Sequence, residues 1–254
     1  MPAAFGSASL LLLVFAVRHL RRASSPLIDL GTLRVPSFRA TVSGGSSFWV
    51  AVSAVPFLLP LLFQVEFGWS AVRSGAVVLF VFVGNIGIKP ATRYLFSRFG
   101  YRSLLALSGM VQAATMAGFA FLTAGTPLAL IAALAVVSGA ARSLGLTGYS
   151  TLAFADIPQE QMRSANTLNA TANQLAAGLG VAAATVALRL GGLIGRLFTG
   201  HRVSPGTDYG VAFCLLALGA LAATAGALRL PPSTGDAVRG RLPQQRRELS
   251  RSSP

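Results

Sequence analysis

Residues 74–122 read SGAVVLFVFVGNIGIKPATRYLFSRFGYRSLLALSGMVQAATMAGFAFL, which is an apolar run, a short basic stretch and a second apolar run. Arg93, Arg98 and Arg102 lie in the basic stretch, and no acid does. Two apolar segments joined by a tight arginine-rich turn are typical of a transmembrane helical hairpin whose loop stays in the cytoplasm. The rest of the chain repeats this pattern.

The composition of the whole chain supports a membrane protein. Of its 254 residues, 53% are hydrophobic and only 11% are charged, whereas soluble domains carry about 25% charged residues. The formal charge of +14 raises the question of nucleic-acid binding, but the arginines lie between apolar runs and are not interleaved with aromatic residues. We therefore expect an all-α integral membrane protein whose surroundings are the lipid bilayer, with no nucleic-acid partner.

Seven apolar stretches approach the roughly 20 residues that a helix needs to cross the hydrocarbon core. They are approximately 2–17, 46–65, 75–92, 104–122, 128–148, 168–190 and 210–228. Each is predicted to be a helix, because backbone groups in lipid have no water to bind. Pro56, Pro60 and Pro90 are expected to kink or end their helices, since proline lacks the amide donor.

The distribution of basic residues predicts the orientation. With residues 18–45 inside, sixteen basic side chains fall on the cytoplasmic side and four fall outside, and cytoplasmic loops carry the excess. The prediction is a multi-pass membrane protein with its N-terminus outside and its C-terminus in the cytoplasm. The low lysine and high alanine, arginine and glycine usage further suggests a bacterial source, and hence a bacterial inner membrane. The polar, basic tail, residues 229–254, is predicted to be disordered.

The reactive residue types exclude several classes of protein. All seven acids lie in loops or at the ends of predicted helices, and His19 and His201 are far apart. A membrane hydrolase needs a paired acid, a metal site or an activated nucleophile, and the sequence has no such pattern. We therefore expect no enzyme activity, no metal site and no cofactor. Cys214 is the only cysteine, which excludes an internal disulfide.

Two polar residues stand out inside the predicted spans. Arg142 lies about 15 residues, or roughly 20 Å, from the outer end of its span. An intramembrane charge is costly enough to suggest function, although a long side chain can also extend to the nearby inner surface. Gln112 is expected to form an interhelical hydrogen bond.

A group of amides marks the sixth predicted span. Asn166, Asn169 and Asn173 recur at positions i, i+3 and i+7 and so fall on one face, which Gln174 flanks. Such a face suits either a water-filled cavity or a seam between helices, and small neighbouring residues also favour close packing. The sequence leaves both interpretations open.

Four stretches of the chain together resemble one known family, the major facilitator superfamily of transporters. They are RHLRRASSPLIDLGTLRVPSFR (18–39), FLLPLLFQVEFGWSAVRSGAVVL (57–79), RYLFSRFGYR (93–102) and DIPQEQMRSANTLNATANQLAAGLGVA (156–182). In this order they resemble the C-terminal half of the fourteen-helix drug:proton antiporter branch. The third stretch is similar to the family's basic loop motif, but Arg93 and Ser97 stand where that motif has Gly and Asp.

The resemblance implies a division of the chain. Residues 1–17 would be a linker transmembrane helix, 18–45 a cytoplasmic basic connector, 46–228 a six-helix C-terminal bundle and 229–254 the tail. It also implies two sets of site residues. Those of the substrate cavity would be Asn85, Arg142, Asn169, Asn173, Gln174, Phe57 and Gln64, and those of the gating loop Arg93, Ser97, Arg98, Gly100 and Arg102.

The function that the resemblance implies is transport. We expect proton-coupled efflux of drugs or small amphiphiles by a partial transporter that lacks the N-terminal bundle, which in the family holds the proton-titrating acids. Such transporters move two bundles around a midplane site, so a separate N-terminal half or a second copy of the chain is the expected partner. The alternative is a membrane remnant or scaffold that does not transport.

Overall fold

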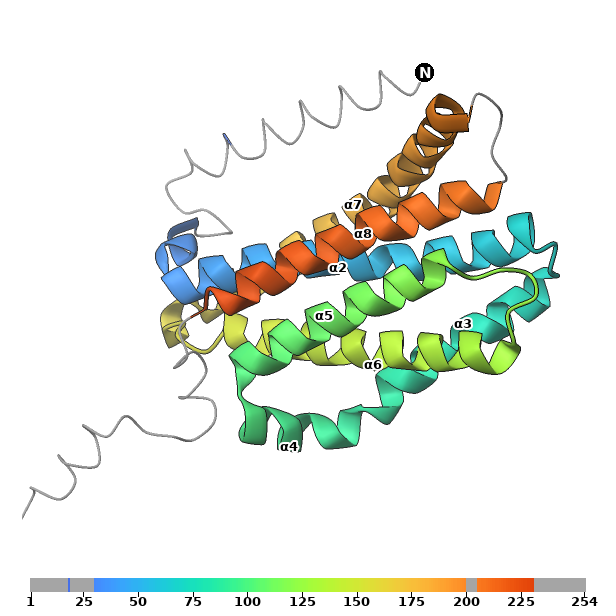
Figure 1. The fold of residues 1–254 in the computed structure, drawn as a ribbon. Helices are drawn as coiled ribbons and strands as arrows, with labels where there is room; N and C mark the ends of the chain where they lie inside the picture. The colour runs from blue at the N-terminus through green and yellow to red at the C-terminus, as the bar shows by residue number, and fades with distance from the viewer. Residues whose placement is uncertain (1–17, 19–29, 200–204, 231–254) are drawn as a thin grey trace, which may run out of the picture.

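The computed structural model describes residues 18, 30–199 and 205–230, and within them every regular element is a helix (Figure 1). A 3-10 turn, η1 (Leu30–Arg34), precedes the first long helix. The longer elements are α2 (Pro36–Leu61), α3 (Ala71–Gly87), α4 (Lys89–Phe99), α5 (Tyr101–Ala120), α6 (Leu128–Ala153), α7 (Met162–Thr199) and α8 (Pro205–Leu228). A π-helical turn, η2 (Leu62–Glu66), extends α2, and a 3-10 turn, η3 (Gln159–Gln161), precedes α7.

The described helices fit the predicted spans from residue 46 onward. Five of them are long and apolar enough to cross a membrane, or six if α3 and α4, bent by 51° from each other, form one broken span. The predicted first span, 2–17, and most of the predicted tail, 231–254, lie outside the described residues. The prediction of an all-α membrane bundle is confirmed.

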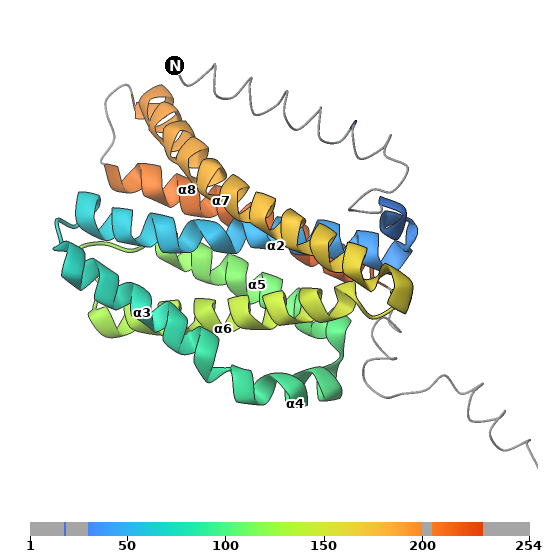
Figure 2. The same ribbon diagram turned by 180° about the vertical axis from the view of Figure 1, so that it is seen from behind.

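The helices pack as a bundle around α2. This helix contacts α6, α7 and α8, while α3 packs on α6, and α5 packs on both α6 and α8. Figure 1 shows α5 and α8 on the near side, and the opposite view in Figure 2 shows α7, α2, α6 and α3. We call the surface formed by these four helices the open face, because α5 and α8 pack behind it.

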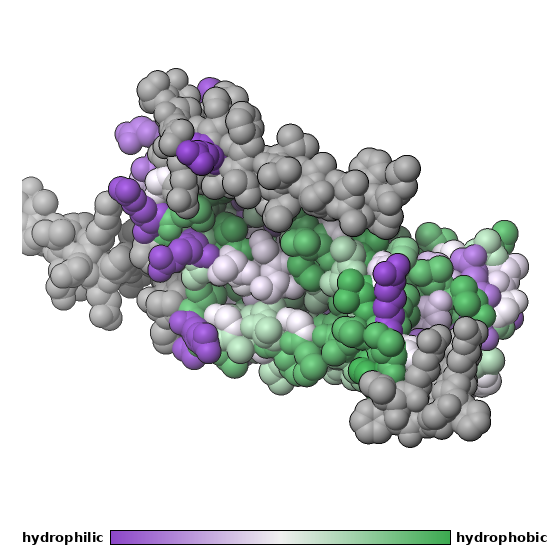
Figure 3. Space-filling view, turned by 90° about the horizontal axis from the view of Figure 1, so that it is seen from above, coloured by the Kyte–Doolittle hydropathy of each residue, from purple (hydrophilic) through white to green (hydrophobic). Residues whose placement is uncertain are grey.

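Large aromatic and aliphatic side chains fill the interior of the bundle. Phe63, Met116 and Phe213 belong to one cluster, and Phe48 and Leu105 belong to a second. Lipid tails are as apolar as these residues, so the contacts stabilise the bundle by close packing and not by removal from water. In a view from above, mostly apolar side chains cover the middle of the described surface, and hydrophilic side chains gather toward one end (Figure 3).

The connector predicted over residues 18–45 is shorter in the structure, because α2 begins at Pro36. Proline is well suited to the first helical turn, where its missing amide hydrogen would have no partner. The residues after Pro36 are mostly polar or small, so hydropathy alone does not indicate that the helix starts there. The early turns are anchored by Phe38, which is fully buried against Ala153 and Ala165. Residues 36–45 are therefore part of α2.

The tight turn predicted around residues 93–102 is also wrong, since most of that stretch is helix α4. Phe96 is buried on one side of α4, and its ring stacks on Tyr101 with centroids 4.6 Å apart. The chain bends between α3 and α4, next to Pro90 in the first turn of α4, as predicted, and again at Gly100, whose φ of +82° disfavours residues with a side chain. Pro56 and Pro60, in contrast, lie within α2 without ending it.

Candidate functional site

Most of the predicted cavity residues lie on the helices that form the open face. Ser53 and Phe57 of α2 and Gln64 of η2, which extends α2, lie on a side that is less buried than the other sides of these elements. These positions are four and seven residues apart and therefore form one stripe along the helix. Phe57 is half-buried in α2, and Gln64 is exposed in η2.

Arg142 lies beside this stripe, on α6. Its Nη1 donates a hydrogen bond to the carbonyl oxygen of Val52 on α2 at 3.4 Å, the long end of the range for such bonds. Its Nε is buried and has no hydrogen-bond partner within the part of the chain that the structure describes. A guanidinium carries five N–H donors, so this side chain is placed but poorly satisfied.

Asn85 lies close to the level of Arg142, where α3 crosses α6. A methyl group added at Gly139 of α6 would lie 3.0 Å from the backbone nitrogen of Asn85, and it would clash with the carbonyl oxygen of Val81. Gly139 precedes Arg142 by three residues, which is roughly 4.5 Å along the helix axis. The structure therefore brings Asn85, on α3, to within about one helical turn of Arg142 in depth.

The amides of α7 lie on the side of the helix that packs against α2. Asn169 and Asn173 are half-buried on the same stripe as Ala165, Ala176 and Gly180. A methyl group at Gly180 would lie 2.5 Å from the Val50 carbonyl oxygen, so α7 and α2 are in close contact there. This position favours a helix seam for Asn169 and Asn173, as the small neighbours suggested.

The other two polar residues of the amide group point away from that seam. Asn166 and Gln174 are exposed. Gln174 is separated from Asn173 by a single position, or about 100° around the helix, and so does not share its contact with α2. The seven predicted cavity residues therefore divide into a central set on α2, α3 and α6, a seam pair on α7, and Gln174 outside both.

The predicted gating residues lie together at one end of the bundle. Arg93, Ser97 and Arg98 are exposed on α4, Gly100 is the break between α4 and α5, and half-buried Arg102 is in the first turn of α5. The Ser97 hydroxyl donates to the Tyr94 carbonyl oxygen at 2.8 Å.

One polar feature of the bundle became visible only in the structure. The buried Ser53 hydroxyl has no hydrogen-bond partner among the described residues, and its Cβ lies 3.0 Å from a methyl group built at Gly180. The stripe that links Ser53 to Phe57 and Gln64 was a signal that the sequence contained. Gln112 donates to the Ser138 hydroxyl oxygen at 3.0 Å between α5 and α6, which confirms the predicted interhelical hydrogen bond.

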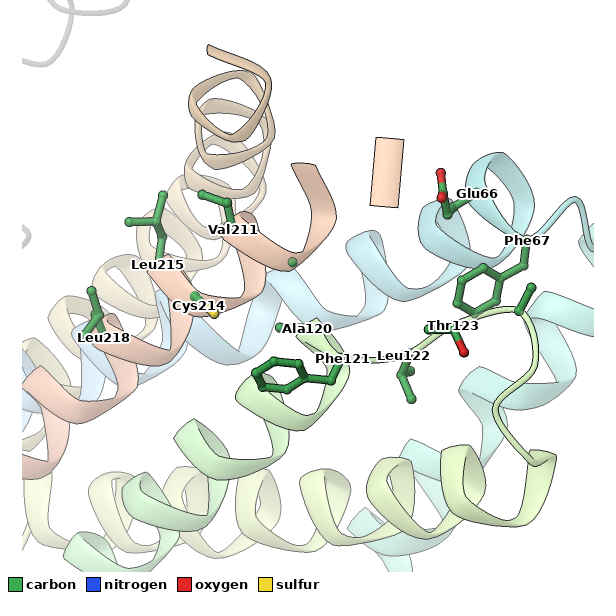
Figure 4. A pocket seen from close by; sticks show the side chains of 12 residues that line it. Glu66, Phe67, Ala120, Phe121, Leu122, Thr123, Val211, Cys214, Leu215 and Leu218 are labelled. Atoms are coloured by element: carbon green, nitrogen blue, oxygen red, sulfur yellow. The ribbon is translucent and has the colours of Figure 1, made fainter. Parts of the chain in front are cut away.

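A separate cavity of about 700 Å³ lies near the α5 and α8 side of the bundle (Figure 4). It is lined by the end of η2, the residues after α5 and the first half of α8, including Phe67, Phe121 and Leu218. Glu66 and Thr123 are its main polar side chains. None of the predicted cavity residues lines it, so it is distinct from the open face.

Comparison with known proteins identifies the family of this chain. A family model described as Major Facilitator Superfamily matches residues 2–181, which is well over half of the chain. The chain belongs to this superfamily. HsrA of Haemophilus influenzae, named as a probable transport protein, is 28% identical over 181 residues, covering 71% of the chain and 39% of the relative. The predicted resemblance is thereby confirmed at the level of the family.

Other members of the superfamily give similar figures. MdtD of Salmonella paratyphi A and of Salmonella typhimurium, named as a multidrug resistance protein, is 27% identical over 206 residues. The match covers 78% of this chain and 41% of each relative. The chain thus spans about two fifths of the length of the curated relatives that it matches, and these relatives are named as transport or resistance proteins.

Proposed function

We propose that this major facilitator chain forms the C-terminal bundle of an exporter for drugs or small amphiphiles. The observation that supports this most is the polar set on the open face. Arg142 is held by one long hydrogen bond and has an unpartnered Nε, and Phe57 and Gln64 lie on the neighbouring helix. A poorly satisfied guanidinium, with an aromatic ring on the adjacent helix α2, is suited to a ligand with an apolar body and an anionic or strongly accepting group.

Proton coupling is part of the same proposal, but it is assigned to acids outside the described bundle. The described acids, Glu66, Asp156, Glu160 and Asp208, lie at the ends of helices or in the links between them. A titrating carboxylate near the middle of the membrane therefore has to come from a complementary bundle. The names of the MdtD relatives, which refer to multidrug resistance, support this class of substrate.

The complementary surface that we propose is an N-terminal six-helix bundle seated on the open face. α7 is the least buried of the candidate spans, and large apolar side chains remain exposed on α3 and α7, among them Leu79, Ile86 and Leu179. Superfamily transporters enclose their substrate site between two bundles. A second copy of this chain is the rival occupant of the face, and the cell inner membrane with a cytoplasmic C-terminus is the proposed location.

The test is transport by proteoliposomes that contain the chain alone or together with an N-terminal half supplied as a separate polypeptide. The two probes are a dansylated fatty acid, which is an anionic amphiphile, and ethidium, a lipophilic cation. We expect flux driven by a proton gradient only when both halves are present. Absence of flux for both probes in both preparations would contradict transport and favour a remnant or scaffold.

Substitutions at Arg142 test the site itself. Arg142→Ala is expected to lower flux of the anionic probe about tenfold or more, the loss typical of one charged hydrogen-bond donor. Arg142→Lys should retain part of that flux, because the charge remains. Arg73→Ala is the matched control, since Arg73 is exposed and lies over the Trp69 ring at 3.9 Å. Unchanged flux of the anionic probe in Arg142→Ala would show that Arg142 does not contribute to binding or transport of this probe.

A further inference from the structure

A basic pocket of about 500 Å³ lies between α4 and the second half of α6. Its lining residues are Lys89, Thr92, Arg93, Phe96, Ser97, Tyr101, Thr147 and Thr151. Two of them are cationic and five carry a hydroxyl group, and none of these described lining residues is acidic. The pocket therefore has the composition of an anion site and not of a cation site.

One cation of the pocket is held in place by a contact between two helices. The Lys89 Nζ donates to the Thr147 Oγ1 at 3.1 Å. An ammonium group has three hydrogens, and this bond uses one of them. Because Thr147 accepts this bond, its own hydroxyl hydrogen remains able to donate. The contact thus positions two donor groups at the wall of the pocket.

The second cation, Arg93, lies four residues after Lys89 on α4 and lines the same pocket. Two like charges at this spacing are neighbours on a helix surface and destabilise it. A negatively charged ligand between them would attract both cations and so offset their mutual repulsion. The pairing of Lys89 and Arg93 around a cavity is therefore easier to explain with an anion bound than without one.

The remaining hydroxyl groups limit where such an anion can be held. Thr92, Ser97 and Thr151 each donate to a backbone carbonyl oxygen of their own helix, at 3.1, 2.8 and 2.8 Å. Their hydrogens are occupied, so the principal donors are the Lys89 ammonium, the Arg93 guanidinium and the Thr147 hydroxyl. A guanidinium and an ammonium that line the same pocket are well suited to the oxygens of a phosphate group.

We propose that this pocket binds a phosphate group, carried either by the headgroup of an anionic phospholipid or by a soluble phosphate. The pocket lies beyond the 51° bend between α3 and α4, at the end of the bundle that the basic residues predict to face the cytoplasm. Phosphate headgroups of the inner leaflet lie at this level. The proposal does not rest on the transport function, because it concerns binding and not flux, although Arg93 and Ser97 of the pocket also belong to the predicted gating residues.

Lys89 makes the proposal directly testable, because it is the only lysine of the chain. The full chain is reconstituted in nanodiscs of pure phosphatidylcholine or of phosphatidylcholine with phosphatidylglycerol. The rate of Lys89 acetylation by an amine-reactive ester is then measured by mass spectrometry of the peptide that contains it. Phosphatidylcholine nanodiscs are also titrated with inorganic phosphate, with chloride at equal ionic strength as reference.

The expected result is slower acetylation of Lys89 when phosphatidylglycerol or inorganic phosphate is present than in phosphatidylcholine nanodiscs alone. A decrease of about fivefold corresponds to the usual attraction between one basic residue and an anionic surface. Protection by phosphatidylglycerol alone identifies a lipid headgroup, and saturable protection by inorganic phosphate identifies a soluble ligand. No protection by either source overturns the proposal.

Two matched variants separate the pocket from the general surface charge. Arg93→Gln removes a lining cation, whereas Arg98→Gln removes an exposed cation of the same helix that does not line the pocket. Each removes one positive charge from α4, so a diffuse surface potential would change equally in both. We expect Arg93→Gln to lose most of the protection and Arg98→Gln to keep it. Equal protection in the two variants would overturn the proposal.

Discussion

Arg142 and Gln112 are two polar side chains inside the bundle with different surroundings. Gln112 is fully buried and donates to Ser138 on the neighbouring helix, so it joins α5 to α6. Arg142 lies at the boundary between α2 and α6 and has only the long contact with Val52. The first side chain serves the packing of the bundle, and the second retains donors for a ligand or a partner.

The hydrogen bond between Gln112 and Ser138 leads to a prediction about stability. Ser138→Ala leaves the buried Gln112 amide without the hydroxyl oxygen to which it donates, and we expect a loss of about 1 kcal/mol in unfolding free energy. The apparent melting temperature in detergent, followed by tryptophan fluorescence, measures this loss. The double variant Gln112→Leu with Ser138→Ala removes both polar groups and should recover most of the stability. A double variant that is less stable than Ser138→Ala would contradict this explanation.

Among the helices, the pair α3 and α6 is distinguished by how closely the backbones approach. A methyl group at Gly84 would clash with the carbonyl oxygen of Val136, and one at Gly139 would clash with that of Val81. Small residues allow this approach in membranes, where close packing replaces the hydrophobic effect as the force between helices. The same crossing sets the depth of Asn85 relative to Arg142.

We therefore predict that Gly84→Ala weakens the bundle. The added methyl group has to displace a helix backbone, for which an overpacking cost of about 1–3 kcal/mol is usual. Gly75→Ala is the matched control in α3, because nothing lies within 4 Å of a methyl group at that position. The apparent melting temperature should fall for Gly84→Ala and stay constant or rise for Gly75→Ala. The opposite order would show that the helices separate easily at this crossing.

The seam between α7 and α2 gives a second prediction for a helix pair. Asn169 is half-buried on the side of α7 that carries Ala165 and Ala176. If it belongs to a seam, Asn169→Ala should lower stability, whereas the exposed Gln174→Ala should leave it unchanged. Melting curves of both variants decide between the two interpretations of the amide group. Lost flux of the anionic probe with unchanged stability in Asn169→Ala would instead favour a cavity.

The complete bundle has two unequal sides. One is closed by the contact of α5 with α8, and the other is the open face of α7, α2, α6 and α3. The open face carries both the poorly satisfied arginine and exposed apolar residues such as Leu179, which is 60% exposed. Lipid can cover the apolar part, but lipid tails offer no hydrogen-bond partner for a guanidinium within a membrane span.

This asymmetry predicts the behaviour of the chain in solution. Coexpressed with a separate N-terminal half, it should copurify as a one-to-one complex, with a higher melting temperature because binding stabilises the folded state. Light scattering in detergent gives the mass of the protein component. A species of about twice the 26.2 kDa chain without the N-terminal half would show that a second copy covers the face. A chain that stays monomeric in the presence of the N-terminal half would contradict the proposal that this half is its partner.

The sequence by itself determined the class of the protein, the approximate spans and the family. The low charge, the apolar runs and the basic loops are local properties, and lipid permits only one backbone solution for such runs. It failed where polar residues continue a helix: Pro36 to Gly45 and the stretch around Arg93 are helical because Phe38 and Phe96 are buried against distant residues. A hydropathy pattern contains no information on such contacts.

Only the tertiary structure decided which polar residues come together. Spacing placed Asn169 and Asn173 on one face, but it could not say that this face meets α2. It marked Arg142 as unusual, but the proximity of Arg142 to Val52, 90 residues away in the chain, depends on helix packing. Periodicity describes one helix at a time, whereas a site is formed by the crossing of several helices, which close contacts at residues such as Gly84, Gly139 and Gly180 determine.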